Sequence, residues 1–422
     1  MKNLERVEAE LVDGKYDEYF NLSFRSNSRD RFLELIKKYK EIFSANGDVI
    51  LVSAPGRTEI GGNHTDHQHG CVLAGSVNLD VIAVAAENNE NVIRIKSEGY
   101  PMDEISLDDL EPNEKEYGCS SAIIRGMVAK FKQLGYEIKG FNAYTSSNVL
   151  KGSGLSSSAA FEVLVGNILN GLFAKEQVSA VEIAKLGQYA ENVYFGKPCG
   201  LMDQMASSLG GAVFIDFKNP DEPIIKKIDF DLEKEGYALC IIDTGADHAD
   251  LTDEYAAIPK EMKAVAEYFK KDVLREVGKN DFLAKIPELR KLYGDRAVLR
   301  TYHFLRENER AQKEAEVLEK QDFKEFLKLV KQSGYSSYMY LQNVNVTGSV
   351  AEQAVGIVLA LCEEFLDGKG AYRVHGGGFA GTVQAFVPLD MLDDFKENIE
   401  KAVGIGNCHV LSIRPTGGTV IR

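Results

Sequence analysis

The sequence predicts two α+β domains, on three observations. The chain has 422 residues, which is enough for two domains with separate hydrophobic cores. Strand-like and helix-like apolar spacings alternate along it, with one long charged helical stretch between two mixed portions. Two prolines and a turn-forming asparagine break the pattern over residues 218–223. We therefore expect an N-terminal domain over 20–225 and a C-terminal domain over 226–422.

The first elements are predicted from apolar spacing and from the turn formers between them. Apolar residues at helical intervals end at Asn46-Gly47 in one segment and at Gly135, a C-cap residue, in another. Alternating apolar residues predict strands, and we expect Pro55-Gly56 to stop the first of these. The expected elements are helices over 29–44 and 123–134 and strands over 49–54, 77–86 and 92–96.

The later elements follow the same signals. A capping box, Ser179-Ala-Val-Glu182, opens a helix whose buried face is expected to contain Ile183, Leu186, Ala190 and Val193. A charged stretch with helical period extends over about 259–333. Strands are expected over 212–217, 237–243 and 383–387, the last directly after a glycine cluster at 376–381.

Charge and cysteine content exclude several classes of protein. Lys and Arg total 49 against 64 Asp and Glu, so the net charge is −15, which argues against nucleic acid and membrane surfaces as partners. A small anionic ligand in a locally positive pocket remains compatible with it. No apolar stretch approaches the ~18 residues of a membrane span, and no secretory signal is visible. Six well-separated cysteines without a CxxC pair indicate reduced thiols in a cytoplasmic protein.

A glycine- and serine-rich loop over 151–160 leads directly into an apolar helix. Glycines let the backbone approach a ligand, and the N–H groups and dipole of a helix start favour an anion such as phosphate. Three consecutive serines add hydroxyls for phosphate oxygens or magnesium. The loop is neither a Walker A loop nor GxGxxG. It indicates a phosphate site, with a serine-capped helix after a flexible loop as the alternative.

Three of the seven histidines gather in residues 55–70. His64, Asp66, His67 and His69 have the ligand chemistry of zinc or iron, but their spacing matches no metal signature and no further His or Cys cluster completes a shell. A polar surface loop is the other alternative. The segment directly follows a buried-looking strand, where α/β sheets often carry binding groups, and this favours a role in binding.

The third segment, residues 373–381, contains His-Gly-Gly-Gly. This string also forms the oxyanion loop of some α/β-hydrolases, but the GxSxG elbow that they need is absent from the sequence. What remains is a backbone that closely approaches a ligand or another loop.

Together these segments resemble the GHMP small-molecule kinases and, within them, the galactokinases. The family's first motif, Gly-Arg-x-Asn-x-x-Gly-Glu-His-x-Asp-Tyr, is similar to residues 56–67, and its phosphate loop, Gly-x-Gly-Leu-Ser-Ser-Ser-Ala, is similar to 152–159. Its late glycine motif corresponds to 376–381, and 196–204 resembles the sequence around the galactokinase catalytic aspartate. The resemblance implies a two-domain α+β GHMP kinase fold: a ribosomal-protein-S5-like N-terminal domain, a ferredoxin-like C-terminal domain and an active site in the cleft between them.

The resemblance implies roles on the phosphoryl-transfer side. Asp203 is expected beside the attacking sugar hydroxyl, as general base or orienting carboxylate, with Arg57 between it and the transferring phosphoryl group. Ser157 and Glu191 match the family's magnesium ligands. The implied ATP-binding residues are Gly152, Ser153, Gly154, Leu155, Ser156, Ser157 and Ser158. Plainer roles stay open: a helix cap for Asp203, a surface arginine for Arg57 and a solvated helix face for Glu191.

On the sugar side the sequence departs from the family. The implied sugar-binding residues are Asn63, His64, Asp66, Gly200 and Tyr255. Asn63 stands where the family has glutamate, and an amide there can still bond a hydroxyl but no longer repels an acidic sugar. Further replacements are Glu59 for asparagine, His67 for tyrosine, and His375 and Ala380 for a hydroxyl residue and a glycine.

We therefore expect an ATP- and magnesium-dependent kinase that converts galactose to galactose 1-phosphate at the anomeric hydroxyl. One alternative is a kinase of the same fold that acts on galacturonate, N-acetylgalactosamine or arabinose. Another is a non-catalytic sugar and nucleotide sensor, which is disfavoured because Ser158-Ala159, Arg57 and Asp203 are all retained.

Overall fold

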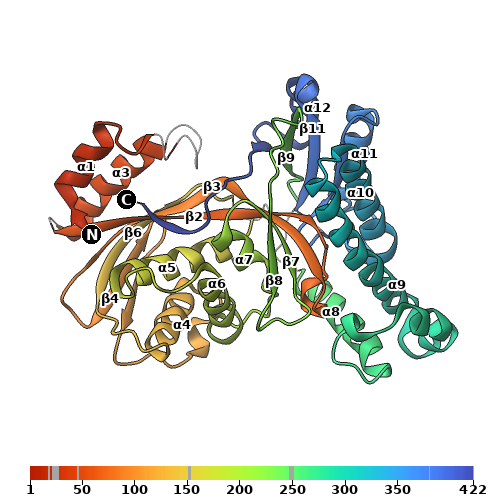
Figure 1. Cartoon of the computed structure of the whole chain (residues 1–422), viewed down its shortest axis with the longest axis horizontal. Coiled ribbons are helices and arrows are strands. Elements are labelled where there is room, and N and C mark those ends of the chain that lie inside the picture. Colours follow the sequence, from red (N-terminus) through yellow and green to blue (C-terminus); the bar gives the residue numbers. More distant parts are fainter. Residues whose placement is uncertain are drawn as a thin grey trace.

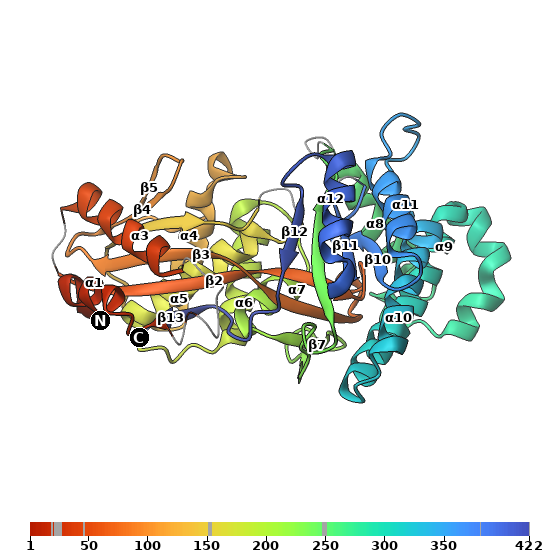
Figure 2. The same ribbon diagram turned by 90° about the horizontal axis from the view of Figure 1, so that it is seen from above.

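Two β-sheets with flanking helices make up the computed structural model of the chain (Figure 1). The longest strands run from the end of the molecule that carries both termini toward the second sheet (Figures 1 and 2). The structure describes residues 1–17, 20, 28–44, 47–150, 154–246, 251–379 and 381–421.

Among the described residues the first sheet has nine strands in the main order β1-β2-β3-β6-β4-β5, with β13 on β2, β7 on β3 and β8 on β7. All pairings are antiparallel except that of β4 with β6. The strands are β1 (Lys2–Asn3), β2 (Asp48–Gly61), β3 (Cys71–Glu87), β4 (Val92–Ser97), β5 (Met102–Ser106), β6 (Phe141–Ser147), β7 (Ala212–Asp216), β8 (Ile224–Ile228) and β13 (Thr419–Ile421).

The helices divide between the two sheets. Those beside the first sheet are α1 (Leu4–Val12), α3 (Ser28–Phe43), α4 (Ser120–Gln133), α5 (Ser157–Phe173), α6 (Ala180–Tyr189) and α7 (Met202–Leu209). The others are α8 (Thr252–Tyr268), α9 (Lys279–Glu319), α10 (Phe323–Ser336), α11 (Ala354–Leu366) and α12 (Leu392–Val403). A π-helical turn, η3 (Ala190–Phe195), continues α6, and another, η5 (Ser337–Leu341), continues α10.

Both faces of the first sheet are covered by helices. On β2, Val49 and Leu51 pack with α1 and α3, whereas Ile50 and Val52 pack with the layer of α4, α5 and α6 (Figure 1). Because neither face of the sheet is exposed to water here, residues 49–52 of β2 are all apolar and do not alternate with polar residues.

The second sheet has the order β10-β11-β9-β12. Its strands are β9 (Tyr237–Asp243), β10 (Ala371–His375), β11 (Thr382–Pro388) and β12 (Cys408–Leu411). In the chain, helices separate β9 from β10, and α12 separates β11 from β12, which is the ferredoxin-like βαββαβ pattern. Cys240 and Ile242 of β9 face α11 and α12, whereas Leu239 and Ile241 lie in the core cluster that includes residues of α10. The expected α+β fold class is confirmed.

Pro55-Gly56 does not stop the first predicted strand, because β2 continues to Gly61. The pairing of β2 with β3 shifts its register between Pro55 and Arg57. A proline has no N–H to donate, and a bulge interrupts the ladder at just such a position. The bulge also redirects the strand, so that Arg57 follows it into the site described below.

The helix opened by Ser179 also differs from the expectation beyond Tyr189. Ser179 accepts a hydrogen bond from the Glu182 backbone N–H at 3.1 Å, as the capping box predicts. From Ala190 the helix widens into a π turn, which rotates the following side chains. Val193 is consequently 37% exposed and not buried as predicted.

The domain division at residue 225 stays a prediction. Strand β8 (Ile224–Ile228) includes that residue and pairs with β7 in the first sheet, and β13 returns to the first sheet from the end of the chain. No described helix combines the length and apolar character that crossing a membrane requires.

Candidate active site

Three loops from distant parts of the chain meet at the end of β2. Asn63 Nδ2 donates to the Gly376 carbonyl at 2.8 Å, which joins the first motif to the third. Gly154 of the phosphate loop also lies against the third motif, because a Cβ there would come within 3.0 Å of His375 Nδ1. The structure thus brings together the three segments that the sequence singled out.

Among these loops, Arg57 forms a two-point ion pair with Asp203. Arg57 Nε lies 2.6 Å from Asp203 Oδ1, and Nη2 lies 2.7 Å from Oδ2. The Arg57 backbone N–H donates to the Leu155 carbonyl at 2.9 Å, and its Nη1 donates to the Gly154 carbonyl. Arg57 is buried, so it is not a surface arginine, whereas 31% of the Asp203 side chain is exposed. The carboxylate can therefore be reached by a ligand.

Asp203 is held in its ionised form. Burial acts to raise the pKa of this carboxyl, but the charge and hydrogen bonds of Arg57, together with Ser156, hold that pKa below its ordinary value. The first turn of α7, where Asp203 lies, also favours a carboxylate through the helix dipole. Leu201 occupies the N-cap position of α7, so Asp203 does not serve as the cap.

The phosphate loop can be followed from Gly154 onward, since Gly152 and Ser153 lie outside the described residues. Leu155 is fully buried, so only its backbone faces the loop. At Ser156 the backbone is left-handed, with φ 56° and ψ 65°, and it turns the chain into α5. N–H groups in the first turn of a helix have no partner within the helix and suit an anion. The partly exposed hydroxyl residues at this turn are Ser156, Ser157 and Ser158.

Asp66 lies close to Asp203, on the side where the family resemblance places the sugar. Burial and the charge of Asp203 raise the pKa of Asp66 to about 6, although backbone N–H groups of His67 and Met202 act in the opposite direction. Gly200 packs directly on this carboxylate, and a Cβ there would lie 1.7 Å from Asp66 Oδ2. Gly200 thus makes room for Asp66, and its direct contact with a sugar stays a prediction.

His64 and Tyr255 both contact the third glycine loop. His64 Nε2 lies 3.1 Å from the Gly377 carbonyl, and burial lowers the His64 pKa to about 4. Because a carbonyl only accepts, Nε2 carries the ring proton and Nδ1 is an acceptor. Tyr255 donates its hydroxyl proton to the Gly378 carbonyl at 2.9 Å. Sugar contacts for both residues stay predictions.

Asn63 does not offer the sugar a hydrogen bond in this arrangement, contrary to the expectation. Its Nδ2 donates to Glu59 Oε1 at 2.9 Å as well as to Gly376, and its Oδ1 accepts from Ser337 and Asn343, each at 3.0 Å. An amide has two donors and two lone pairs, so all its capacity is used. The fully buried Asn63 fixes the loop that carries His64 and Asp66.

The two replacements at positions 59 and 63 are in direct contact. The carboxylate that the family motif places at 63 is found here on Glu59, which Asn63 touches. Arg373 Nη2 lies 2.5 Å from Glu59 Oε1, and Arg373 Nη1 donates to the Ile60 carbonyl at 3.0 Å. Burial raises the pKa of Glu59 to about 7 against the charges of Arg373 and Arg57. The sequence shows each replacement separately. Only the structure shows that the two residues touch, so that the amide and the carboxyl group of the family motif have changed places at one contact.

A group of buried acidic residues lies between α5, η3 and α7. Gln204 Nε2 donates to Glu162 Oε2 and to Glu191 Oε2, both at 2.9 Å, and Lys197 Nζ lies 3.4 Å from Glu191 Oε1. Glu191 is buried and does not lie on a solvated helix face. Glu162, Gln204 and Lys197 were not predicted as site residues from the sequence. One signal was available for Glu162: it is the only charged side chain among the 17 residues of α5.

The histidines near β2 do not form a metal site. Within the described ranges, no group of three or more His, Cys, Asp and Glu residues is placed to hold a metal ion. His67 is buried at its ring nitrogens, which have no hydrogen-bond partner in the part of the chain that the structure describes. Burial and the charge of His64 lower the His67 pKa to about 3, so the ring is neutral.

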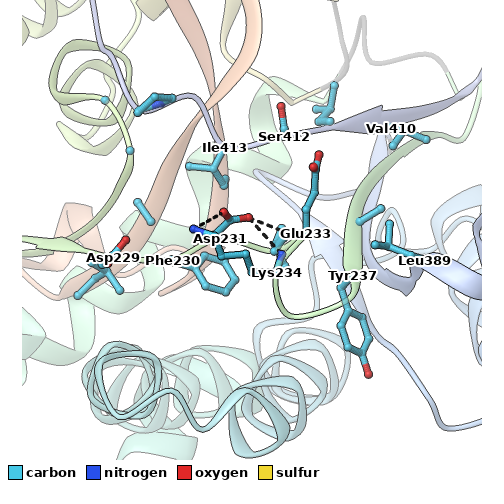
Figure 3. A pocket seen from close by; sticks show the side chains of 18 of the residues that line it. Asp229, Phe230, Asp231, Glu233, Lys234, Tyr237, Leu389, Val410, Ser412 and Ile413 are labelled. Carbon is cyan, nitrogen blue, oxygen red and sulfur yellow. Dashed lines mark hydrogen bonds and ion pairs between the residues drawn. The ribbon is translucent and has the colours of Figure 1, made fainter. Parts of the chain in front are cut away.

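A cavity of about 800 Å³ lies elsewhere, lined by parts of both sheets, and neither Arg57 nor Asp203 lines it (Figure 3). Charged groups at its wall bond to one another: Lys234 Nζ lies 3.1 Å from Asp231 Oδ2, and Asp231 Oδ1 accepts from two backbone N–H groups. The convergent polar groups expected of a substrate site lie at the motif loops and not here.

Family models match the two parts of the chain that carry these residues. Residues 37–87 match the model described as the galactokinase galactose-binding signature, and residues 122–211 match the GHMP kinases N terminal domain. The first range contains Arg57 and Asp66, and the second contains the phosphate loop and Asp203.

Individual relatives and solved structures agree with the models. A galactokinase of Limosilactobacillus reuteri (strain DSM 20016) is 29% identical over 382 residues, which cover 87% of this chain and 93% of that protein. The crystal structure of Lactococcus lactis galactokinase complexed with galactose has a TM-score of 0.80 and 25% identity, covering 93% of this chain and 100% of that one. L. major mevalonate kinase in complex with R-mevalonate shares the fold, with a TM-score of 0.57, 14% identity and coverage of 86% and 96%. In its fold, its converging motif loops and these matches, the chain resembles the GHMP kinases and, within them, the galactokinases.

Proposed function

We propose that this protein is a sugar kinase that transfers the γ-phosphoryl group of ATP to the anomeric hydroxyl of galactose, forming galactose 1-phosphate. The observation that carries the proposal is the Arg57–Asp203 pair, which joins the phosphate loop to the pocket of Asp66 and His64. The galactokinase signature and the galactokinase relatives support galactose as the acceptor.

The pair suits phosphoryl transfer, which needs positioning and charge compensation more than covalent help. The ionised Asp203 carboxylate orients the anomeric hydroxyl and accepts its proton. The hydroxyl oxygen then bonds to the γ-phosphorus as the bond to the β–γ bridging oxygen breaks and ADP leaves. Arg57, pinned between Asp203 and the phosphate-loop carbonyls, places a fixed positive charge beside the developing negative charge.

We further propose Mg²⁺ as the metal, held by the Ser157 hydroxyl and the Glu191 carboxylate. Mg²⁺ prefers oxygen donors and often takes only one or two side chains, with phosphates and water completing its shell. The buried carboxylate of Glu191, close to the helix that Ser157 begins, fits this donor set. When bound, the ion neutralises charge on the β- and γ-phosphates.

We also propose a cytoplasmic location, where ATP is available as co-substrate. All six cysteines are free in the structure, four of them buried, which agrees with a reducing compartment.

An assay of ADP release over a panel of sugars tests the proposal. Galactose should be turned over well above galacturonate, N-acetylgalactosamine and arabinose. Preference for another sugar would overturn the assignment of galactose while keeping the kinase. Absence of turnover with every sugar, together with a thermal shift by galactose and a nucleotide analogue, would identify a sensor instead.

A further inference from the structure

Glu162 is a buried carboxyl group that the proposed mechanism does not use. It lies on α5, just beyond the first turn that Ser157 begins, and it is fully buried. Its Oε2 accepts one hydrogen bond, from Gln204, whereas its Oε1 has no partner among the described residues. Burying a carboxyl group costs folding free energy, so a buried carboxyl group beside the phosphate loop indicates a role in the site.

Gln204 connects Glu162 to the proposed transfer site. Its Nε2 donates to Glu162 Oε2 and Glu191 Oε2, both at 2.9 Å, with Cys199 Sγ farther away at 3.6 Å. An amide nitrogen carries two hydrogens, so the two carboxyl groups share them. Gln204 directly follows Asp203 in the first turn of α7. Its orientation is therefore tied both to Glu191 and to the residue proposed as catalytic base.

We propose that Glu162 is a positioning residue of the phosphoryl-transfer site: through Gln204 it fixes the Glu191 carboxylate and the start of α7 that carries Asp203. The inference rests on the proposed function. Without an acceptor at position 162, Gln204 keeps only one carboxylate partner, and the amide and Glu191 can then turn together away from the phosphate loop.

The surroundings of Glu162 show which variants test this role. Burial, followed by the charges of Glu191 and Asp203, raises its pKa well above the ordinary value, while Gln204 and Lys197 act in the opposite direction. A neutral acceptor therefore suits the position, and Glu162→Gln keeps an acceptor oxygen in the same place. Glu162→Met removes the acceptor with little change in volume.

Calorimetric titration of the full chain with a non-hydrolysable ATP analogue measures the effect apart from turnover. In Mg²⁺, Glu162→Met should weaken analogue binding about tenfold, the low end for loss of a group that orients a metal ligand. In EDTA its affinity should stay within about twofold of wild type, and Glu162→Gln should stay within about threefold in both buffers, because the shared hydrogen bond survives. In the assay with galactose, kcat of Glu162→Met should fall about tenfold, with the KM for galactose nearly unchanged.

Asn167→Leu is the matched control on the same helix. Asn167 is also buried, and its Nδ2 donates to the Val163 carbonyl at 2.8 Å, away from Gln204. This variant should lower the thermal midpoint without changing the Mg²⁺-dependent part of analogue binding.

Three results would overturn the positioning role of Glu162. The first is an affinity of Glu162→Met for the ATP analogue in Mg²⁺ that equals that of wild type. The second is a loss of affinity in EDTA as large as the loss in Mg²⁺. The third is a loss of affinity in Glu162→Gln as large as that in Glu162→Met. Wild-type protein that turns over no sugar, while the Mg²⁺-dependent difference persists, would instead contradict the proposed function and leave the positioning role standing.

Discussion

The phosphoryl-transfer side and the sugar side of the site are built from similar residues in different ways. On the transfer side, Asp203 pairs with Arg57 yet keeps 31% of its side chain exposed. On the sugar side, Glu59 pairs with Arg373 in full burial, and Asn63 has no hydrogen-bonding capacity left. Asp203, which is proposed to act on the acceptor, keeps part of its surface open, whereas Glu59 and Asn63, which shape a binding loop, are buried. Substitutions on the two sides should therefore separate into effects on rate and effects on stability.

Asp203→Asn should have the largest effect, and its main effect should be on rate. An amide cannot take the hydroxyl proton, and it gives up the ion pair with Arg57, so kcat should fall about 10³-fold. Binding of a non-hydrolysable ATP analogue should stay within about threefold of wild type, since the phosphate loop is untouched. Steady-state ADP release and calorimetric titration provide the two readouts.

Asp393→Asn is the matched control for this prediction, because Asp393 is an exposed aspartate in the first turn of α12. It should leave both readouts unchanged. A near-normal rate in Asp203→Asn would show that Asp203 takes no part in phosphoryl transfer and that the two sides of the site do not differ in this way.

Asn63→Glu should act mainly on stability. It places a second carboxyl group beside Glu59 in a buried site where Arg373 is the paired cation. We therefore expect a loss of about 3 kcal/mol in the free energy of unfolding, as for other buried charges left without a partner. Glu59→Asn leaves Arg373 buried without its carboxylate and should cost a similar amount. Urea unfolding measures both.

The double variant Glu59→Asn/Asn63→Glu restores the order of residues in the family motif and keeps one amide and one carboxyl at the same contact. It should recover about 2 kcal/mol relative to the sum of the single variants, because groups in contact do not act additively. Additive losses would show that the exchange is not compensatory and that the sugar side is not one connected network.

The same contrast explains which parts could be predicted from sequence. The transfer side was accessible because its residues stand in short linear motifs, each of which fixes a local structure: a helix start after glycines, or an aspartate in a first turn. The fold class followed for a similar reason, since apolar spacing reports local elements and their order. The bulge at Pro55 was missed because a proline ends a strand in isolation but is tolerated where the partner strand shifts its register.

The sugar side depends on contacts between remote segments, which spacing does not reveal. Asn63 matched a substrate-binding position, yet its availability depends on Ser337 and Asn343, in and beside the π turn after α10. In the same way, a carboxylate such as Glu191 near the C-terminal end of a helix is unfavourable against the helix dipole. Its buried position becomes clear only from the π turn, which directs the side chain inward. Whether a polar atom is free or already bonded is a property of the packed structure.

Binding of galactose should weaken in acid through Asp66. Its carboxyl group has a pKa raised to about 6, and only the ionised form can accept strong hydrogen bonds from sugar hydroxyls at both oxygens, so the KM for galactose should be constant above pH 7 and rise about tenfold by pH 5. His64 has a pKa of about 4 and stays neutral in this range, and Asp203, with its lowered pKa, stays ionised. The ratio kcat/KM measured from pH 5 to 8 should show the acid limb, and kcat alone should not.

Asp66→Asn supplies the control, since an amide does not titrate. It should raise the KM at neutral pH and abolish the acid limb. A pH-independent KM in the wild type would mean that Asp66 is not a ligand of the sugar, and that the sugar side acts on the substrate through neutral groups only.

The smallest effect should come from Glu314, a fully buried carboxyl of α9 behind the sugar side. A Cβ on Gly61 would lie 1.7 Å from its Oε2, and neither carboxyl oxygen has a hydrogen-bond partner within the described residues. Burial and then the charge of Glu307 raise the pKa of Glu314 well above its ordinary value, although Arg373 and Arg310 oppose this. The folded chain therefore keeps a proton that the unfolded chain releases.

This difference gives the stability of the protein a defined pH dependence. A folded-state pKa above the unfolded one lends stability that is complete in acid and is lost as pH rises through the folded pKa. Glu314→Gln keeps the shape without the charge, so its free energy of unfolding relative to wild type should increase by about 1.4 kcal/mol per pH unit above pH 5, for as long as the folded wild type keeps the proton. Glu316→Gln, on the exposed face of the same helix, should show no such change in urea unfolding over this pH range. If the stabilities of Glu314→Gln and wild type depend on pH in the same way, Glu314 is charged in the folded chain. The buried carboxyl groups of the sugar side would then be ionised, as Asp203 is.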